Sequence, residues 1–342
     1  MSKLLRLNYI GSKFKLLEWI TQEIKEKTGW ETFQEKRIAD LFAGTGIVSY
    51  HFRTLGAKVF SNDAELYSAI ITKAMTLCAY TDACKEWMEA IQKDFQEGKG
   101  TAGYITRNYS NFEGQTRMFF TVKNALRIDW VRSRLEVDRL SGVLTHNDHI
   151  YLTACLLLAA DAVSNVPAVY GCYLKNFKAK ANVDLELRPI HILPTKGKGS
   201  CTNSDVLALD SEEQDLVYLD PPYNERQYSK NYFPLNLIAK PPSDTVGPLK
   251  GVTGIPEGCF LSPFCQKGSV VEAFKTLIGS LKTTWIVLSY SSESLIKKDD
   301  MLNLLGDYGE VSVVERDYKR FKSFEYNETN TVKEYLFFLR KT

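Results

Sequence analysis

The chain has 342 residues, of which 44% are apolar and 25% are charged. This composition is ordinary for a globular protein, and the length allows one large domain or one domain with a substantial insertion. The net charge is only +2. Any surface that binds nucleic acid must therefore arise from local clustering of basic residues and not from an overall basic character.

Seven cysteines and four histidines are scattered along the chain. No two cysteines have CxxC spacing, which argues against a metal site built on zinc ligands, and thiols without a pattern are typical of a reducing compartment. Residues 1–13 lack the apolar run of a signal peptide, and no stretch approaches the roughly 18 uninterrupted apolar residues of a membrane span. We therefore expect a soluble cytoplasmic protein without membrane association or metal.

Residues 13–80 show the alternation of a βαβ unit. The hydrophobic spacing predicts, in chain order, a helix over 13–27, a strand over 37–42, a helix that ends near 55, a strand over 58–61 and a helix over 64–80. A glycine-rich stretch follows the first strand and an acidic residue ends the second, as is typical of a ligand-binding βαβ unit.

Residues 81–200 break this alternation. Polar and basic loops over 96–117 are followed by helical patterns and by an apolar helix over 150–163. The region then turns basic at Lys175, Lys178, Lys180, Lys196 and Lys198. We expect a largely helical insertion between two parts of one catalytic domain, 1–80 and 201–342.

Strand signals return after residue 200. We expect strands over 204–209, 216–219 and 285–290, a proline- and glycine-rich loop over 239–269, a helix over 270–281, and a C-terminal hairpin of strands over 311–314 and 334–339. Strands that alternate with helices predict an α/β fold with a doubly wound, mostly parallel sheet.

The segment from Asp40 to Gly46 (DLFAGTG) lies at the predicted turn from the first strand to the next helix. Glycines at such a turn allow positive φ angles and a close approach to a ligand, at the sheet edge where α/β folds bind ligands. Asp63 ends the next strand, in a suitable place for ribose hydroxyls. The pattern GxGxxS departs from the GxGxxG of dinucleotide sites, and the acid before the glycines favours a ligand with an amine. The alternative is a tight turn with a structural role only.

The segment Asp220-Pro221-Pro222-Tyr223 follows an apolar strand and is the strongest signal in the sequence. Its prolines remove backbone donors and stiffen the chain. The Asp220 carboxylate and the Pro221 carbonyl could accept both hydrogens of an aromatic amino group and turn its lone pair toward an electrophile. Tyr223 offers a face on which a base can stack, an interaction worth roughly 1–3 kcal/mol in single-strand binders. The alternative is a proline-stiffened turn.

In this combination the chain resembles the adenine-N6 DNA methyltransferases of restriction-modification systems with the Dam-like, alpha-type motif order. The family's N-terminal cofactor motif is similar to Asn8 to Lys13, its FxGxG turn to Phe42 to Gly46, its ribose-binding acid to Asp63, its acid near the cofactor's adenine to Asp205, and its catalytic tetrad to Asp220 to Tyr223. Its later strands are similar to 288–292 and 333–337, whereas 81–200 matches only loosely.

The resemblance implies a Rossmann-like methyltransferase fold with a mixed seven-strand sheet whose last strand is antiparallel, bound S-adenosylmethionine, and double-stranded DNA with the target adenine flipped out of the helix. The residues expected to bind the cofactor are Tyr9, Gly11, Ser12, Lys13, Asp40, Phe42, Gly44, Gly46, Asp63, Asp205 and Asp220. Those expected to act on the adenine are Asp220, Pro221, Pro222 and Tyr223. This chemistry requires neither a metal nor a covalent enzyme nucleophile.

Region 81–200, with the 226–268 loop as a further candidate, is expected to select the DNA sequence. Lys175, Lys178, Arg226 and Tyr228 are candidates for DNA contact, and solvated helix faces and loops are the equal alternative. Cations and aromatics also interleave over 318–324, where we favour core packing for the aromatics. The partners expected are DNA and a cognate restriction endonuclease, with a monomer in solution.

Two other functions remain open on the sequence. Related tetrads occur in enzymes that methylate RNA bases or glutamine side chains, and the glutamine enzymes usually carry Asn where this chain has Asp220. RNA adenine is therefore the first alternative substrate. The second alternative is a catalytically silent nucleic-acid-binding subunit, against which the intact glycines and the intact tetrad argue.

Overall fold

The computed structural model describes residues 7, 9–190, 192, 198–210, 212–244, 246–319 and 331–342. The chain forms two compact units. The sheet unit comprises Ile10–Thr72, Pro194–Gln227 and Leu261–Thr342, and the helical unit comprises Met1–Tyr9, Lys73–Leu193 and Tyr228–Phe260. Among the described residues, no helix has both the length and the apolar character needed to cross a bilayer.

A seven-stranded sheet forms the centre of the sheet unit, with strand order β3-β2-β1-β4-β7-β9-β8. The strands are β1 (Arg37–Asp40), β2 (Lys58–Asp63), β3 (Gly199–Asn203), β4 (Gln214–Leu219), β7 (Thr283–Ser291), β8 (Gly309–Lys319) and β9 (Thr331–Lys341). β3, β2, β1, β4 and β7 pair in parallel, whereas β9 is antiparallel to both β7 and β8. The expected mostly parallel sheet with an antiparallel last strand is thus confirmed.

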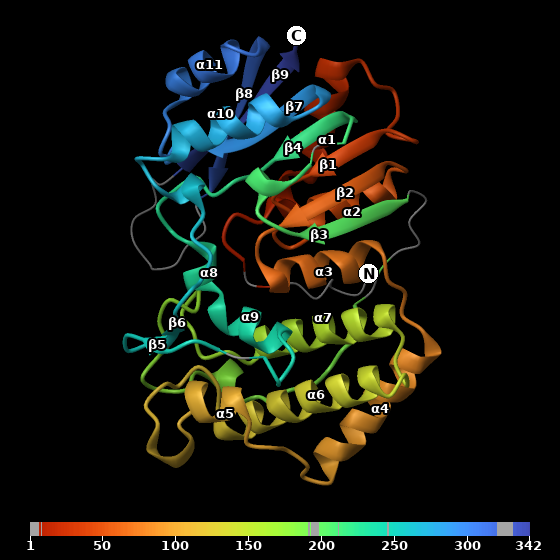
Figure 1. Ribbon diagram of the computed structural model, residues 1–342, viewed down its shortest axis with the longest axis vertical. Helices are drawn as coiled ribbons and strands as arrows, with labels where there is room; N and C mark the ends of the chain where they lie inside the picture. Colours follow the sequence, from red (N-terminus) through yellow and green to blue (C-terminus); the bar gives the residue numbers. More distant parts are fainter. Residues whose placement is uncertain are drawn as a thin grey trace. The chain divides into compact units, whose positions relative to one another are not determined.

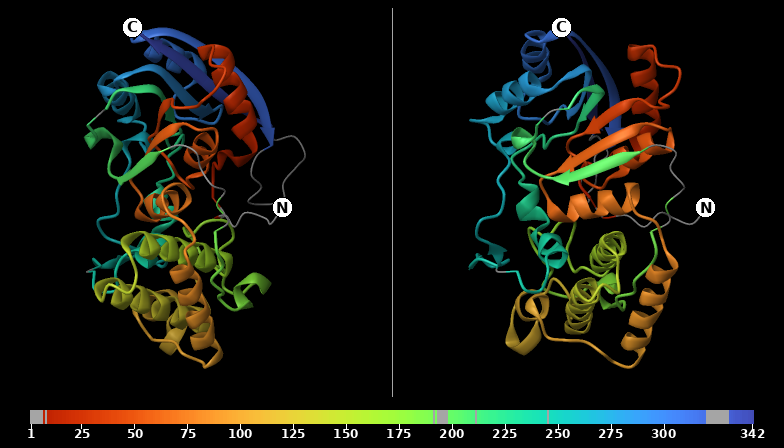
Figure 2. Two further views of the ribbon diagram at one scale, coloured as in Figure 1. Left: turned by 90° about the vertical axis from the view of Figure 1, so that its right-hand side faces the viewer. Right: turned by 45° about the vertical axis from the view of Figure 1, so that its right-hand side comes forward.

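Helices cover both faces of this sheet (Figures 1 and 2). On one face lie η1 (Lys13–Leu16), α1 (Leu17–Thr28) and α2 (Ile47–Thr54), with α3 (Leu66–Thr76) starting in this unit. Thr21 Oγ1 lies 2.7 Å from His51 Nε2, which joins α1 to α2. On the other face, α10 (Val270–Ser280) and α11 (Lys298–Gly306) pack their apolar sides against alternate residues of the strands.

The expected strand over 204–209 is wrong. The strand that pairs with β2 is β3, which ends at Asn203, and the following residues form the short 3-10 helix η4 (Val206–Ala208). Asp205 caps η4, because its Oδ1 accepts a hydrogen bond from the backbone of Leu207 at 3.1 Å. The β3 sequence GSCTN has little intrinsic preference for a strand, so its pairing with β2 decides its conformation.

The helical unit is built around α7 (His146–Ala162), which is buried along nearly its whole length, as the apolar run predicted. Around it lie α4 (Asp82–Gln96), α5 (Tyr104–Tyr109), α6 (Val122–Leu140), α8 (Tyr228–Asn231), α9 (Phe233–Ala239) and the small hairpin of β5 (Leu249–Lys250) and β6 (Ile255–Pro256). Thr145 and Asp148 form a capping box that begins α7.

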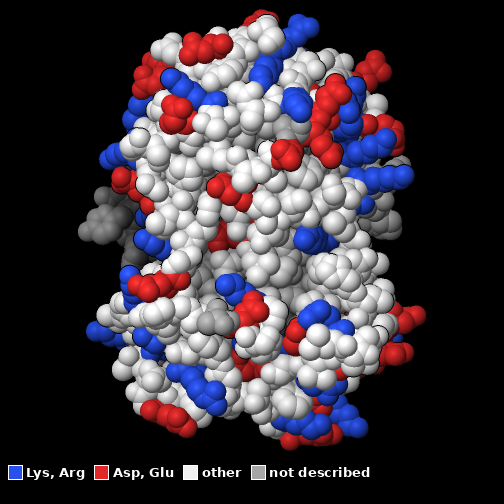
Figure 3. Space-filling view, viewed as in Figure 1, with Lys and Arg blue, Asp and Glu red and all other residues white. Residues whose placement is uncertain are grey.

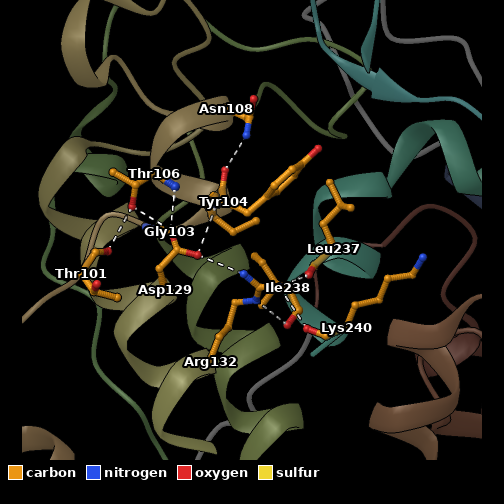
Figure 4. A network of polar contacts seen from close by, with 11 residues as sticks. Thr101, Gly103, Tyr104, Thr106, Asn108, Asp129, Arg132, Leu237, Ile238 and Lys240 are labelled. Atoms are coloured by element: carbon orange, nitrogen blue, oxygen red, sulfur yellow. Dashed lines mark hydrogen bonds and ion pairs between the residues drawn. The ribbon is translucent and has the colours of Figure 1, made fainter. Parts of the chain in front are cut away.

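The helical unit does not coincide with the expected insertion 81–200, because Tyr228–Phe260 belongs to it as well. The buried Arg132 of α6 explains this difference. Its guanidinium donates to the carbonyls of Leu237, Ile238 and Lys240 at the end of α9, and it also pairs with Asp129 at 3.0 Å (Figure 4). A buried guanidinium that lost these acceptors would carry a large desolvation penalty, so α9 is held to α6.

Candidate active site

Acidic side chains end or follow neighbouring strands at one edge of the sheet. Asp40 ends β1, Asp63 ends β2, Asp205 comes soon after β3, and Asp220 directly follows β4. Since these strands are adjacent and parallel, their carboxyl ends meet at the same edge, where open α/β sheets bind ligands. The expected site residues of the sheet unit therefore come together around this edge.

The glycine turn between β1 and α2 is fixed by Asp63. The backbone N–H of Gly44 donates to Asp63 Oδ2 at 2.7 Å, and the N–H of Glu65 donates to Asp63 Oδ1 at 2.8 Å. Gly46 has φ +73°, and a Cβ there would lie 2.8 Å from Oγ1 of Thr72. Both the backbone conformation and the close packing thus require glycine at position 46.

Asp40 is buried, and its two carboxylate oxygens differ. Oδ2 accepts a hydrogen bond from Ser49 Oγ at 2.6 Å, and Ser49 Oγ in turn accepts one from Ser61 Oγ at 2.8 Å. Oδ1 is buried and has no hydrogen-bond partner among the described residues. Burial raises the pKa of Asp40 to about 7, opposed by Ser49 and assisted by the charges of Asp220 and Asp63.

Lys13 forms an ion pair with the first residue of the tetrad. Its Nζ lies 2.8 Å from Asp220 Oδ1 and donates to the carbonyl of Gly11 at 3.2 Å. The Lys13 side chain is 4% exposed and that of Asp220 is 19% exposed. Burial alone would lower the pKa of Lys13, but the charges of Asp220 and Glu334 raise it above its ordinary value. Burial raises the pKa of Asp220, and Lys13 opposes that shift.

The remainder of the tetrad is held by the core of the sheet unit. Pro221 is buried, and Pro222 and Tyr223 are half-buried. The Tyr223 carbonyl accepts a hydrogen bond from the backbone of Leu295 at 2.9 Å, and its ring packs against the core on the α10 face. Burial raises the pKa of Tyr223, which favours the neutral phenol. The tetrad is thus held at both ends. Tyr223 contacts the core through its carbonyl and its ring, and the Asp220 carboxylate pairs with Lys13.

The other residues expected to bind the cofactor include Phe42, Gly11, Ser12 and Tyr9, and their local contacts differ. Phe42 makes an edge-to-face contact with Phe264 at 5.3 Å between ring centroids, so one side of its ring belongs to the core. Gly11 has φ +80°, and Ser12 precedes η1 without capping it through its side chain. Tyr9 lies in the helical unit, where its ring stacks on that of Tyr232 at 5.0 Å and lies 5.4 Å from that of Tyr228.

The side chains expected to contact DNA differ in their exposure to solvent. Lys175 and Arg226 are exposed, and Tyr228 is half-buried within the Tyr9 cluster. Lys178 is half-buried, and its Nζ donates to the carbonyl of Val166. Burial lowers the pKa of Lys178. Of the interleaved stretch at 318–324, residues 320–324 lie outside the described part of the chain.

Three residues of the site were not anticipated: Ser49, Ser61 and Glu334. Ser49 is the serine of the GxGxxS pattern, which the sequence presented only as a departure from dinucleotide sites. Ser61 lies in β2, directly after Phe60. Because successive side chains of a strand point to opposite faces of the sheet, this order was the available signal that Ser61 faces away from Phe60. Glu334 in β9 is half-buried, and its electrostatic effect on Lys13 depends on sheet pairing that local sequence does not specify.

The motif order and the acids at the sheet edge agree with the expected family, and comparison of the whole chain decides it. Residues 9–304 match the family described as D12 class N6 adenine-specific DNA methyltransferase. The chain belongs to this family. The methyltransferase therefore acts on adenine in DNA and takes its methyl group from S-adenosylmethionine.

Named relatives are similar over nearly the whole methyltransferase. Type II methyltransferase M.CviAII of Paramecium bursaria Chlorella virus 1 is 39% identical over 334 residues, which cover 98% of each chain. M.NlaIII of Neisseria lactamica is 34% identical, covering 98% of this chain and all of the relative. M.FokI of Planomicrobium okeanokoites is 32% identical, but the match covers only 53% of that relative.

Proposed function

We propose that the sheet unit binds S-adenosylmethionine and an adenine flipped out of duplex DNA at the edge formed by β1, β2 and β4. The observation that carries this proposal is the position of Asp220, a mostly buried carboxylate directly after β4 that is followed by two prolines and the half-buried Tyr223. Because an amino group within a stacked duplex is out of reach, the base must leave the helix before transfer.

The acids at this edge fit the charge of the cofactor. Asp40 Oδ1 is buried without a partner among the described residues, and an ammonium would supply the missing donor. The charges of Asp63 and Asp220 act on Asp40, so the edge is also complementary to a sulfonium cation. Gly44 and Gly46 place no side chain at their two positions of the turn. We assign cofactor contact to Gly11, Ser12, Lys13, Asp40, Phe42, Gly44, Gly46, Asp63, Asp205 and Asp220. Tyr9, which lies in the helical unit, remains a candidate on the sequence resemblance alone.

Positioning supplies most of the catalysis in this proposal. When bound, the cofactor supplies an electrophilic methyl group. The adenine nitrogen is a weak nucleophile because its lone pair is delocalised into the ring. Asp220 and the Pro221 carbonyl accept the two amino hydrogens, which favours a lone pair directed at the methyl carbon. The ring of Tyr223 stacks on the base, while Pro222 stiffens the segment.

The helical unit is the proposed region for DNA recognition. A pocket of about 320 Å³ opens beside α5, and its lining includes Tyr104, Arg107, Asn108, Pro242 and the buried Asp129–Arg132 pair. Arg107 is exposed, and arginine and asparagine are the side chains best suited to guanine and adenine edges. On the face shown in Figure 3, basic and acidic side chains are intermixed. Recognition through a few such residues suits this surface better than broad electrostatic attraction.

The names of the relatives support a role in restriction and modification. M.CviAII and M.NlaIII are both type II methyltransferases and match over nearly their full lengths. We infer that this chain protects sites in DNA from a cognate restriction endonuclease, and that it works in the cytoplasm as a monomer. Lys175, Lys178, Arg226 and Tyr228 remain the further candidates for DNA contact.

Methylation of a random-sequence duplex library, read by mapping N6-methyladenine, tests this function. We expect one short sequence to be methylated at one adenine and a matched RNA to remain unmodified. Methylation of the RNA instead would assign the enzyme to the alternative substrate. Cofactor binding without transfer to any duplex would indicate a silent nucleic-acid-binding subunit.

A further inference from the structure

Two buried serines connect three elements of the sheet unit at Asp40. Ser61 belongs to β2, Ser49 to α2 and Asp40 to β1. The exposed fractions of these residues are 1%, 0% and 1%. Ser61 Oγ donates to Ser49 Oγ at 2.8 Å, and Ser49 Oγ donates to Asp40 Oδ2 at 2.6 Å. The hydroxyls form a short chain that ends on one carboxylate oxygen.

The chain has a direction that depends on the charge of Asp40. An ionised carboxylate only accepts hydrogen bonds, so the Ser49 hydroxyl must donate its single proton to Asp40. Its oxygen then accepts the hydrogen bond from Ser61. Each bond polarises the next, which strengthens the contact with the charged end. If Asp40 were protonated on Oδ2, that oxygen would become a donor and the Ser49 hydroxyl would have to reorient. The arrangement therefore favours the ionised carboxylate.

The charges around Asp40 oppose ionisation. Asp63 of β2 and Asp220 after β4 are acids whose charges act on it, and Tyr218 of β4 also interacts with it electrostatically. Lys13 is a nearby cation but is paired with the other carboxylate, Asp220. Burial also opposes ionisation of Asp40. Its negative charge therefore depends on the hydrogen bond from Ser49 and on any donor that binds Oδ1.

We propose that Ser49 and Ser61 are positioning residues that keep Asp40 ionised and leave its Oδ1 directed at the ammonium group of S-adenosylmethionine. This inference rests on the proposed cofactor site, and it explains why Asp40 is ionised there. The serines themselves do not touch the cofactor. They act through Asp40, so their loss should change how cofactor affinity depends on pH.

The test is calorimetric titration of S-adenosylmethionine into the full chain between pH 5.5 and 9. For the wild type, affinity should fall as pH decreases through about 7, because protonated Asp40 no longer attracts the ammonium. In Ser49→Ala the carboxylate loses its donor, and one hydrogen bond to a charged group corresponds to a shift of about one pH unit or more. We therefore expect the midpoint to move upward by about one unit or more and affinity at pH 7 to fall at least roughly fivefold.

Three further variants separate this role from packing. Ser61→Ala should move the midpoint in the same direction by less, and it carries the test if Ser49→Ala does not fold. Ser49→Cys, with a weaker donor, should lie between the wild type and Ser49→Ala. Ser294→Ala is the matched control, since it also removes a buried hydroxyl, which donates to the Ile296 carbonyl at 2.8 Å. It should lower thermal stability without moving the midpoint.

The outcomes distinguish the serine chain from the cofactor site on which it rests. If Asp40→Asn abolishes binding but folded Ser49→Ala and Ser61→Ala keep the wild-type midpoint, the serine role is overturned and the site stands. A midpoint that moves equally in Ser294→Ala would also overturn it. If Asp40→Asn binds S-adenosylmethionine as the wild type does, the proposed role of Asp40 itself fails.

Discussion

The ammonium of Lys13 lies 2.8 Å from Oδ1 of Asp220, the carboxylate that we expect to hold the adenine amino group. Both side chains are largely buried, so the pair is screened little by solvent. Lys13 keeps Asp220 ionised in an environment where burial raises the pKa of its carboxyl group. The same contact occupies one acceptor position of the acid, so an incoming amino group must share the carboxylate with the lysine or displace it.

Replacement of Asp220 tests the catalytic assignment. Asp220→Ala deletes an acceptor at the reacting nitrogen, and we expect transfer to slow by at least roughly a hundredfold, as for other preorganised contacts. S-adenosylmethionine affinity, measured by calorimetry, should change much less than the transfer rate measured with tritiated cofactor. Near-normal transfer would remove Asp220 from the mechanism.

Tyr223 separates stacking from proton transfer. Tyr223→Phe keeps the ring and should leave the single-turnover rate within a few-fold of wild type. Tyr223→Ala loses the stacking face, and a contribution of roughly 1–3 kcal/mol corresponds to a fall of about fivefold to 160-fold. Equal and severe loss in both variants would mean that the phenol hydroxyl takes part.

The Lys13–Asp220 pair predicts a shift in the pH profile. In Lys13→Met the buried Asp220 loses its cation, so its pKa rises further and less of it is ionised at neutral pH. Transfer at pH 7 should fall and partly recover as pH increases, with the acidic limb of kcat/KM moved upward by about one unit or more. Lys15→Met, a change at an exposed lysine of the same 3-10 helix, is the control and should keep the wild-type profile.

Asp63 should affect both stability and cofactor binding. Each of its oxygens accepts one backbone N–H of the turn region, from Gly44 and Glu65. Asp63→Ala leaves both donors without this acceptor, at a cost of about 2 kcal/mol or more in the free energy of unfolding. S-adenosylmethionine affinity should fall as well. Denaturant unfolding and calorimetry measure the two effects, and unchanged affinity in a destabilised variant would limit Asp63 to a structural role.

DNA recognition can be tested at Lys175 and Arg107. Lys175→Glu should weaken DNA binding and flatten its dependence on salt by about one unit of slope or more, with cofactor affinity unchanged. Arg107→Ala should instead reduce discrimination among duplexes that differ by one base pair. Lys85→Glu, at an exposed position of α4 in the same unit, is the control. If both variants match the wild type, recognition lies elsewhere.

Lys178 is expected to behave differently from Lys175. Because its Nζ donates to the Val166 carbonyl and its side chain is half-buried, Lys178→Glu should lower the melting temperature of the protein. A loss of DNA affinity in this variant counts as DNA contact only if thermal unfolding is unchanged.

The residues at the sheet edge could be predicted because a strand, a glycine turn and an acid are close in sequence. Asp40, Gly44 and Asp63 were predicted in this way, and Asp220 was predicted from the Asp-Pro-Pro-Tyr segment that follows an apolar strand. The position of β3 could not be, because its polar residues become a strand only through pairing with β2. Local patterns also place Tyr9 beside Lys13, whereas the tertiary fold packs its ring with Tyr228 and Tyr232 in the other unit.

The helical unit takes three separate lengths of chain, and the catalytic tetrad lies between the second and the third of them in the sequence. An exchange of residues 81–200 alone between relatives would pair a foreign α6 with the native end of α9. The hydrogen bonds from Arg132 to the carbonyls at the end of α9 would then no longer be specified. Chimaeras intended to change sequence preference must therefore replace 73–193 and 228–260 together. By the same reasoning, recombination that moves this region as one contiguous piece carries Asp220 to Tyr223 along with it.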